Sequence, residues 1–325
     1  MLRKSTYLWI LIVLMVWPLM AGGGSVSDLN KVGVGARVMG MGNTFVGIAD
    51  DCNSLFSNPA GLGTIGSLEL MSMKTSLIGD VDYLVLGGAF PLETGTLGVG
   101  YIGANVEDII LVTALNSYSR PVAGDRTSYG EKEFFLGYGV DLLKDIAGMI
   151  DLDGSLYLGA NAKLYSKEAA GVDQGQGSGF GMDLGLLYAP TDKFSLGISQ
   201  QNIGSQISWQ SGAKDQVEAL TKIGLKLQVE KIMLGMDADI AGDDRPIVMH
   251  GGAEWWVMPQ LAVRGGFDQS VQPKVEGSAA KNTVISNITF GVGLKLWGVS
   301  IDYAYHPYYE ETDNLTHFMS LSYSQ

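Results

Sequence analysis

The sequence predicts an all-β protein, a transmembrane antiparallel β-barrel of about 14 strands with an N-terminal hatch or plug segment. Segments of about ten residues alternate between apolar side chains and small or polar ones. No apolar run after the first 23 residues is long enough for a membrane helix, and glycine supplies 45 of 325 residues, roughly twice its usual ~7% share. A closed barrel is the architecture that presents an apolar surface to lipid without such runs.

The start of the chain has the order of a secretory signal peptide. Arg3 and Lys4 precede an apolar block over residues 7–20, and small residues follow at 21–25. The block is shorter than the ~20 apolar residues of a membrane-spanning helix, so we expect residues 1–23 to be removed on export. This gives three predicted parts: a signal peptide over 1–23, a hatch or plug over 24–66, and an outer-membrane barrel over 67–325.

Alternation places the barrel strands. In residues 232–240, for example, Ile, Leu, Met, Ala and Ile alternate with Met, Gly, Asp and Asp. A soluble β-sandwich or propeller also alternates, but its outer face would be polar, whereas here the charges share the glycine-rich face. The predicted strands are 67–78, 81–92, 95–107, 131–143, 155–168, 177–189, 194–204, 221–230, 232–242, 247–258, 261–270, 286–297, 299–308 and 317–325.

The connections are mostly short on one side and long on the other. This asymmetry is typical of bacterial outer-membrane barrels, whose short turns are periplasmic and whose long loops are extracellular. We therefore predict a location in the bacterial outer membrane, in contact with its lipid, with both termini periplasmic. The predicted long loops include 108–130, 205–220 and 271–285.

The inward faces carry a nearly balanced set of charges, seven acids and five bases. We expect a hydrogen-bonded network that braces the barrel and holds the hatch, because a strongly selective pore more often has a lopsided ring. Glu254 and Arg264 lie on neighbouring strands, so we predict an ion pair between them. The predicted lumenal residues are Asp141, Lys163, Asp183, Lys222, Lys226, Asp237, Asp239, Glu254, Arg264, Asp268, Lys295 and Asp302.

The segment before the first strand matches neither barrel nor linker. Its second half, from Asp50 and Asp51 to Leu62, predicts a short helix that ends at Asn58 and Pro59. A compact segment ahead of a wide barrel is most simply a plug. Its glycines would let the backbone lie close against the wall. Gly40, Gly42 and Gly47 are the glycines in question.

The same segment resembles the N-terminal signature of the PorV/PorQ family of outer-membrane proteins. The closing strands, around residues 302–305 and 316–323, also resemble that family, and the N-P-A-G-L element occurs in the related FadL family of hydrophobic-compound transporters. The resemblance implies a fourteen-stranded barrel with an N-terminal hatch. The signature residues are Gly35, Ala36, Arg37, Gly40, Met41, Gly42, Asp50, Asp51, Asn58, Pro59 and Ala60.

Other functional classes find little support. The acidic balance, 34 acidic against 21 basic side chains, argues against nucleic acid as a partner. No dinucleotide-binding fingerprint is complete, and the three histidines are too scattered to predict a metal site. We expect no enzyme activity, no cofactor and no metal. The single cysteine, Cys52, excludes an internal disulfide and is predicted to be a small buried apolar residue.

Two functions remain, from different classes. The resemblance favours a PorV-like component of protein export, which would bind exported cargo proteins and a secretion translocon through loops 108–130 and 205–220. In the second loop, Ile207, Trp209 and Leu220 are the candidate contacts. The alternative is FadL-like passive uptake of a hydrophobic small molecule.

The uptake alternative predicts an apolar pocket beside the hatch. Its candidate ligand contacts are Phe45, Leu55 and Phe56.

Overall fold

The structure is a computed structural model, and it describes part of the chain in detail. The predicted signal peptide, residues 1–23, lies outside the described residues. Those residues are 25–26, 28–77, 81–116, 119–145, 153–242, 245–276, 279–307 and 315–325.

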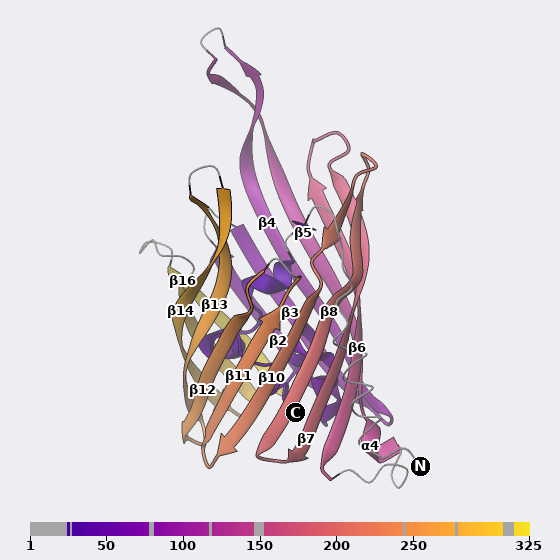
Figure 1. Cartoon of the computed structure of the whole chain (residues 1–325), viewed down its shortest axis with the longest axis vertical. Helices are drawn as coiled ribbons and strands as arrows, with labels where there is room; N and C mark the ends of the chain where they lie inside the picture. The colour runs from indigo at the N-terminus through magenta and orange to yellow at the C-terminus, as the bar shows by residue number, and fades with distance from the viewer. Residues whose placement is uncertain are drawn as a thin grey trace.

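Fourteen antiparallel strands close into a barrel, which confirms the predicted fold class (Figure 1). The barrel closes where the last strand pairs with the first, with Met319 opposite Lys74 and Ser324 opposite Glu69. The strands are β2 Glu69–Leu77, β3 Val81–Leu92, β4 Gly95–Leu115, β5 Pro121–Asp141, β6 Ser155–Ala169, β7 Gln176–Thr191, β8 Phe194–Trp209, β10 Leu220–Val229, β11 Ile232–Ile240, β12 Val248–Met258, β13 Leu261–Glu276, β14 Ala279–Leu296, β15 Val299–Pro307 and β16 Leu315–Ser324.

The wall has an apolar outer face, and its inner face is polar on many strands and apolar on β2 to β4. In β11, Leu234 and Met236 point outward and are 39% and 44% exposed, whereas the next residue, Asp237, points inward and is buried. The same division recurs in β14, where Ile288 and Phe290 point outward and Thr289 is buried. Successive side chains of a strand point to opposite faces, so local alternation is enough to fix which residues enter the lumen. Within the described ranges, no helix is long and apolar enough to cross a membrane.

The two ends of the barrel differ. At one end, which we call the short-turn end, strands are joined by turns such as 192–193, 230–231 and 297–298. At the other, the long-loop end, the β4–β5 hairpin projects well beyond the neighbouring strands (Figure 1). Ser324 lies at the short-turn end, where its N–H donates to the Gly298 carbonyl at 2.8 Å.

The first described residues lie at the long-loop end. There β1, Ser25–Val26, pairs in parallel with β9, Lys214–Val217. Residues 1–24, on which the predicted position of the N-terminus depends, are outside the described residues. The first described residues and Ser324 thus lie at opposite ends of the barrel. The N-terminal segment connects the two ends through the barrel interior.

Three predicted loops are largely strand. Regions 108–130 and 271–285 are extensions of the β4–β5 and β13–β14 hairpins, and 205–220 contains the end of β8 and all of β9. Pairing between hairpin strands does not require lipid on either face, so it continues past the apolar belt. In the third region Ile207 and Leu220 are buried, which corrects their prediction as exposed cargo contacts, while Trp209 is half-buried.

Residues 28–66, which we call the N-terminal segment, lie inside the barrel (Figure 1). The segment contains η1 Leu29–Val32, α2 Ala36–Gly40, α3 Ser54–Ser57 and η2 Pro59–Thr64. The helix predicted to begin at Asp50 or Asp51 and to end at Asn58 and Pro59 is the shorter α3, which ends at Asn58 and is followed by η2. Asn58 separates them, because its side chain accepts a hydrogen bond from the Ala60 N–H and begins η2. One further helix, α4 Leu142–Asp145, follows β5 at the short-turn end.

Candidate functional site

Glycines bring the backbone of the N-terminal segment against the wall on several sides. A Cβ atom added at Gly40 would lie 2.9 Å from the Cα atom of Gly291 in β14. One added at Gly47 would lie 2.5 Å from the backbone nitrogen of Leu225 in β10. Gly42, with φ of 66°, is equally close to the β13 backbone. A side chain at these positions would push the segment away from the wall, so glycine is required for the close approach.

An apolar surface of the segment packs on β3 to β7. Leu55 and Leu62 fill the space over glycines of the wall: a Cβ atom at Gly98 would lie 2.9 Å from a Cδ1 atom of each leucine. At Gly137 it would lie 2.6 Å from Leu55. Phe56 packs edge to face against Phe135 of β5, with ring centroids 5.0 Å apart. These contacts form the largest apolar cluster of the described core.

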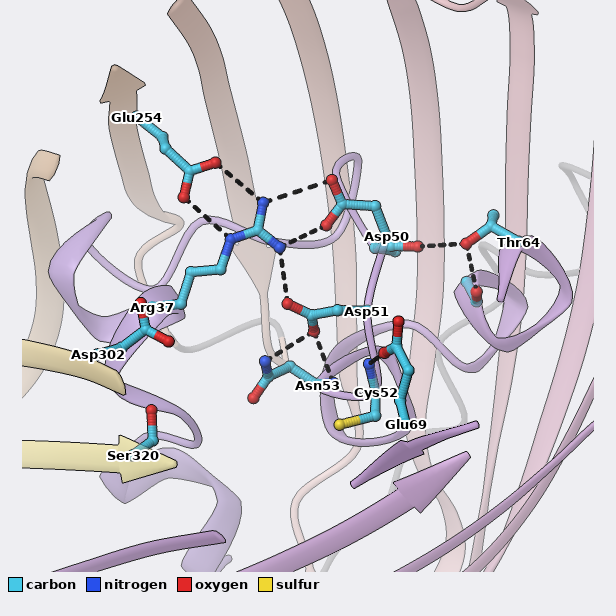
Figure 2. A network of polar contacts seen from close by, with 12 residues as sticks. Arg37, Asp50, Asp51, Cys52, Asn53, Thr64, Glu69, Glu254, Asp302 and Ser320 are labelled. Carbon is cyan, nitrogen blue, oxygen red and sulfur yellow. Dashed lines mark hydrogen bonds and ion pairs between the residues drawn. The ribbon is translucent and has the colours of Figure 1, made fainter. Parts of the chain in front are cut away.

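A polar network joins the segment to the opposite wall (Figure 2). The Arg37 guanidinium of α2 donates to both carboxylate oxygens of Glu254 in β12, at 3.0 and 3.1 Å. Its Nη1 atom also donates to Asp50 and to Asp51, each at 2.6 Å. The bidentate contact is the strongest arrangement available to an arginine and a carboxylate. Burial alone would lower the pKa of Arg37, but the charges of Asp50, Glu254 and Asp51 raise it well above its ordinary value.

The wall continues this network. Arg264 of β13 donates to Glu254 at 2.7 Å, so the predicted ion pair is present, and to Asp302 of β15 at 2.6 Å. Glu254 therefore bridges one arginine from the wall and one from the segment. We refer to these six residues as the Arg37 network: Arg37, Asp50, Asp51, Glu254, Arg264 and Asp302.

Direct hydrogen bonds hold the segment backbone on β7, β8 and β11. The Asp237 carboxylate accepts from the N–H groups of Phe45 and Val46 at 2.7 and 2.9 Å. Ser195 of β8 donates its hydroxyl to the Gly47 carbonyl at 2.6 Å. Asn58 donates to the carbonyl of Val46 as well as to that of Leu186 in β7. The predicted inward carboxylate Asp237 thus binds the segment itself.

The start of the segment enters a buried ion cluster. Lys163 of β6 lies 3.0 Å from Asp183 of β7 and 4.0 Å from Asp28. Burial by itself raises the pKa of Asp28, but the charge of Lys163 and a hydrogen bond from Asn202 outweigh it and lower the pKa. The N–H of Leu29 completes the contact by donating to Glu133, a buried carboxyl group that the alternation analysis did not select.

Other predicted lumenal residues lie nearer the rims. Asp141 is half-buried and accepts from the N–H of Leu143 at the start of α4. Lys226 is half-buried and Lys295 is exposed towards the short-turn end. Lys222 lies deeper in the barrel, where it forms an ion pair with Asp239 at 3.0 Å.

The histidines are less scattered than their sequence positions indicate. His250 of β12 and His306 of β15 both contact the Asp268 carboxylate, at 2.6 and 3.0 Å. His250 also lies 3.4 Å from Asp239. All of these positions are inward in the alternation pattern, which could have identified the cluster. Over the part of the chain that the structure describes, no group of three or more His, Cys, Asp and Glu residues is placed to hold a metal ion.

Two chambers lie on either side of the N-terminal segment. The upper chamber, about 330 Å³, faces the long-loop end and is lined by residues such as Lys222, His250 and Asp268. The lower chamber, about 370 Å³, faces the short-turn end and is lined by the Arg37 network. Asn53 lines both chambers and therefore stands where they approach each other.

The three candidate ligand contacts are placed differently from one another. Phe56 lines the upper chamber. Phe45 and Leu55 are fully buried in apolar clusters, where they pack against segment and wall. The apolar surface expected to receive a hydrocarbon is thus largely occupied by the segment's own side chains.

Solved structures with a similar fold are outer-membrane transporters. The toluene transporter TodX of Pseudomonas putida aligns with a TM-score of 0.63 at 14% identity, covering 92% of this chain and 99% of TodX. The toluene transporter TbuX of Ralstonia pickettii gives 0.56 at 15% identity, with 92% and 99% coverage. A FadL homologue of Pseudomonas aeruginosa gives 0.56 at 10% identity, with 93% and 99% coverage. At such identities the likeness establishes the fold.

Sequence comparisons add less. Residues 97–232 match a model described as a family of unknown function, DUF5723. No curated protein matches the chain. The fold comparison therefore establishes an architecture shared with these transporters, and the PorV/PorQ resemblance stays a prediction.

Proposed function

We propose that this protein is an outer-membrane barrel that carries small solutes across the membrane, with the N-terminal segment as a plug that must shift for solute to pass. The observation that carries the proposal is the position of the segment between the two chambers. Solute in the upper chamber meets the segment before it can reach the lower one. The apolar outer face, which includes Leu234 and Phe290, suits contact with lipid hydrocarbon.

The likeness to transporters supports the same class. TodX and TbuX are described as toluene transporters, and their fold covers nearly all of this chain. A shared fold does not transfer a substrate, because one fold hosts several functions. The proposal therefore takes transport from the likeness and leaves the substrate to the chamber itself.

A reversible cross-link tests the plug. Ala36 of the segment lies close to Ser320 of β16, with the Ala36 N–H donating to the Ser320 hydroxyl at 3.2 Å. We would introduce Ala36→Cys and Ser320→Cys in a Cys52→Ser background and measure solute flux into vesicles. Flux should be lost on oxidation and return on reduction, while either single cysteine variant should not respond.

Two outcomes would count against the proposal. Flux that persists with the cross-link formed would show that solute does not pass through the position of the segment. Absence of flux from every reduced, folded sample, with solutes ranging from sugars to toluene, would overturn the transport role.

A second candidate is the PorV-like handling of exported proteins. Its structural support is the projecting β4–β5 hairpin, where Ile110 and Val112 are more than half exposed. Shortening the hairpin between residues 108 and 125 should abolish co-purification of a translocon or cargo protein if this role is correct. Unchanged co-purification would remove the hairpin from consideration.

A further inference from the structure

Most of the side chains that line the upper chamber carry a polar or charged group, although apolar atoms supply the larger share of its surface. Amides and hydroxyls reach it from the N-terminal segment and from several strands of the wall. Each amide carries both donors and acceptors, and each hydroxyl can act as either. The amide and hydroxyl residues of the lining are Asn30, Asn43, Asn53, Ser57, Gln201, Gln269, Ser270, Gln272 and Asn287.

The charged groups of the lining are already paired. Glu218 lies 2.8 Å from Lys31 and 2.9 Å from Arg245. Asp239 pairs with Lys222 at 3.0 Å. A charged solute that displaced Lys222 from Asp239 would leave a largely buried carboxylate without its ion-pair partner, which is costly.

The remaining charged groups of the lining are satisfied in the same way. Asp268 contacts His250 at 2.6 Å, and Asp28 accepts a hydrogen bond from Asn202 at 2.6 Å. Each acid of the lining thus has a lysine, an arginine, a histidine or an amide as its partner, which favours a neutral solute.

Some buried polar atoms in this lining lack a protein partner. Asn53 is 8% exposed and uses its Nδ2 and backbone N–H on Asp51, but its Oδ1 atom has no hydrogen-bond partner. The Oδ1 atom of Asp239 is also buried without a hydrogen-bond partner. Both atoms are covered by protein and lie behind the chamber surface, so hydrogen bonds to a solute would come from the amides and hydroxyls of the lining.

Apolar surface reaches the chamber from the wall, at Leu220, Val248 and Val271, and from the N-terminal segment. Val34, Val38 and Phe56 of the N-terminal segment form an apolar patch on the floor of the chamber. Hydroxylated ring compounds combine C–H faces with hydroxyl edges, and this chamber offers apolar surface among many hydrogen-bonding groups.

We propose that the upper chamber binds a neutral solute rich in hydroxyl groups, in contact with Gln272 of β13 and Asn287 of β14. The inference rests on the proposed transport function, for which it names the substrate class. It departs from the toluene for which TodX and TbuX are named. The volume of about 330 Å³ is at the lower end of the usual range for small-molecule sites, which suits a mono- or disaccharide.

Binding to the purified full-length protein in detergent tests the inference. The probes are glucose, sucrose, toluene, benzoate and spermidine, followed by saturation-transfer NMR and titration calorimetry. We expect saturable binding of at least one sugar and none of the ionic probes. Asn287→Leu and Gln272→Leu should each weaken sugar binding about tenfold, whereas Gln228→Leu, which changes an amide of the lower chamber, should leave it unchanged.

Each contrary result has a distinct meaning. Binding of toluene that survives where neither sugar binds would overturn the polar assignment, as would preferential binding of benzoate or spermidine. Equal loss of sugar binding in Gln228→Leu would remove the upper chamber as the site. Sugar binding without vesicle flux would contradict the transport proposal alone, and flux of other solutes without sugar binding would contradict this inference alone.

Discussion

Two groups of contacts between the N-terminal segment and the barrel differ in kind. On β3 to β7, Leu55, Phe56 and Leu62 pack into space left by wall glycines. On β8 to β16, Arg37 and the backbone at Phe45 to Gly47 bind through charges and hydrogen bonds.

The difference suggests how the segment can move without leaving the barrel. Apolar packing is non-directional and can be replaced only by another apolar surface, which a polar solute does not supply. Hydrogen bonds and ion pairs can be exchanged for water or for a polar solute. The packing of Leu55, Phe56 and Leu62 is therefore suited to stay in place, while the contacts of Arg37 and residues 45–47 with β8, β11 and β12 are released.

The largest expected effect comes from placing a side chain where the N-terminal segment packs closely against β6. A Cβ atom at Gly159 of β6 would lie 2.2 Å from the backbone carbonyl of Pro59, so Gly159→Val places its side chain inside the backbone of η2. We expect a loss of about 3 kcal/mol or more in the free energy of unfolding, measured by urea titration in detergent. Gly66→Val is the matched control, because a Cβ atom at Gly66 meets nothing within 4 Å. Equal stability of the two variants would contradict the close packing of η2 on β6.

A smaller effect is expected for the polar contacts. Arg37→Met leaves Glu254, whose side chain is 2% exposed, without its partner from the segment. We expect a loss of about 3 kcal/mol at most, since Arg264 still pairs with Glu254, together with larger solute flux. Lys74→Met removes an exposed ion pair of the wall and should change the free energy of unfolding by less than ~1 kcal/mol.

Solute flux through the Arg37→Met variant shows whether the contacts of Arg37 are among those released during transport. If Arg37→Met lowers stability but leaves flux as in the unsubstituted protein, these contacts are not among those released. Arg37→Lys should fall between, because lysine keeps the charge and loses the bidentate geometry.

The backbone contact at Asp237 should contribute less than the Arg37 network. Asp237→Ala removes the acceptor for the N–H groups of Phe45 and Val46, and we expect a loss of about 2 kcal/mol in the free energy of unfolding. Asp237→Asn keeps an oxygen at that position and should lose about half as much. An asparagine variant as unstable as the alanine variant would show that the carboxylate charge, rather than the hydrogen bonds, holds the segment.

Cys52 reports on the segment without a stability change. Burial, followed by the charges of Asp51 and Glu69, raises the pKa of its thiol well above the ordinary value, so the neutral form persists at pH 8. We expect maleimide to react with the folded protein at least about tenfold more slowly than with the urea-unfolded chain at that pH. Arg37→Met should accelerate the reaction in the folded protein if release exposes this side of the segment. An equal reaction rate in the two folded proteins would show that Cys52 belongs to the part of the N-terminal segment that does not move.

Much of the barrel could be predicted because strand alternation is a local property of the chain. The fourteen strands, their inward faces and the Glu254–Arg264 pair all follow from period-two patterns and short turns. Glycines such as Gly40 and Gly47 also stand out before folding, because their density is unusual for a strand or a helix. The lengths of the long hairpins could not be predicted, because a strand that continues beyond the apolar belt loses its alternation of apolar and polar residues.

The tertiary structure alone decided which inward residues meet and what they enclose. Asp268 contacts histidines 18 and 38 residues away, and Arg37 meets a carboxylate 217 residues further along the chain. Such partners depend on how strands from distant parts of the sequence face each other across the lumen, which no local pattern specifies. The sequence by itself determined a barrel wall of alternating strands and a glycine-rich N-terminal segment able to pack closely against it. Closure of the barrel around that segment determined that its apolar residues would be used in packing and that many polar side chains would line the upper chamber.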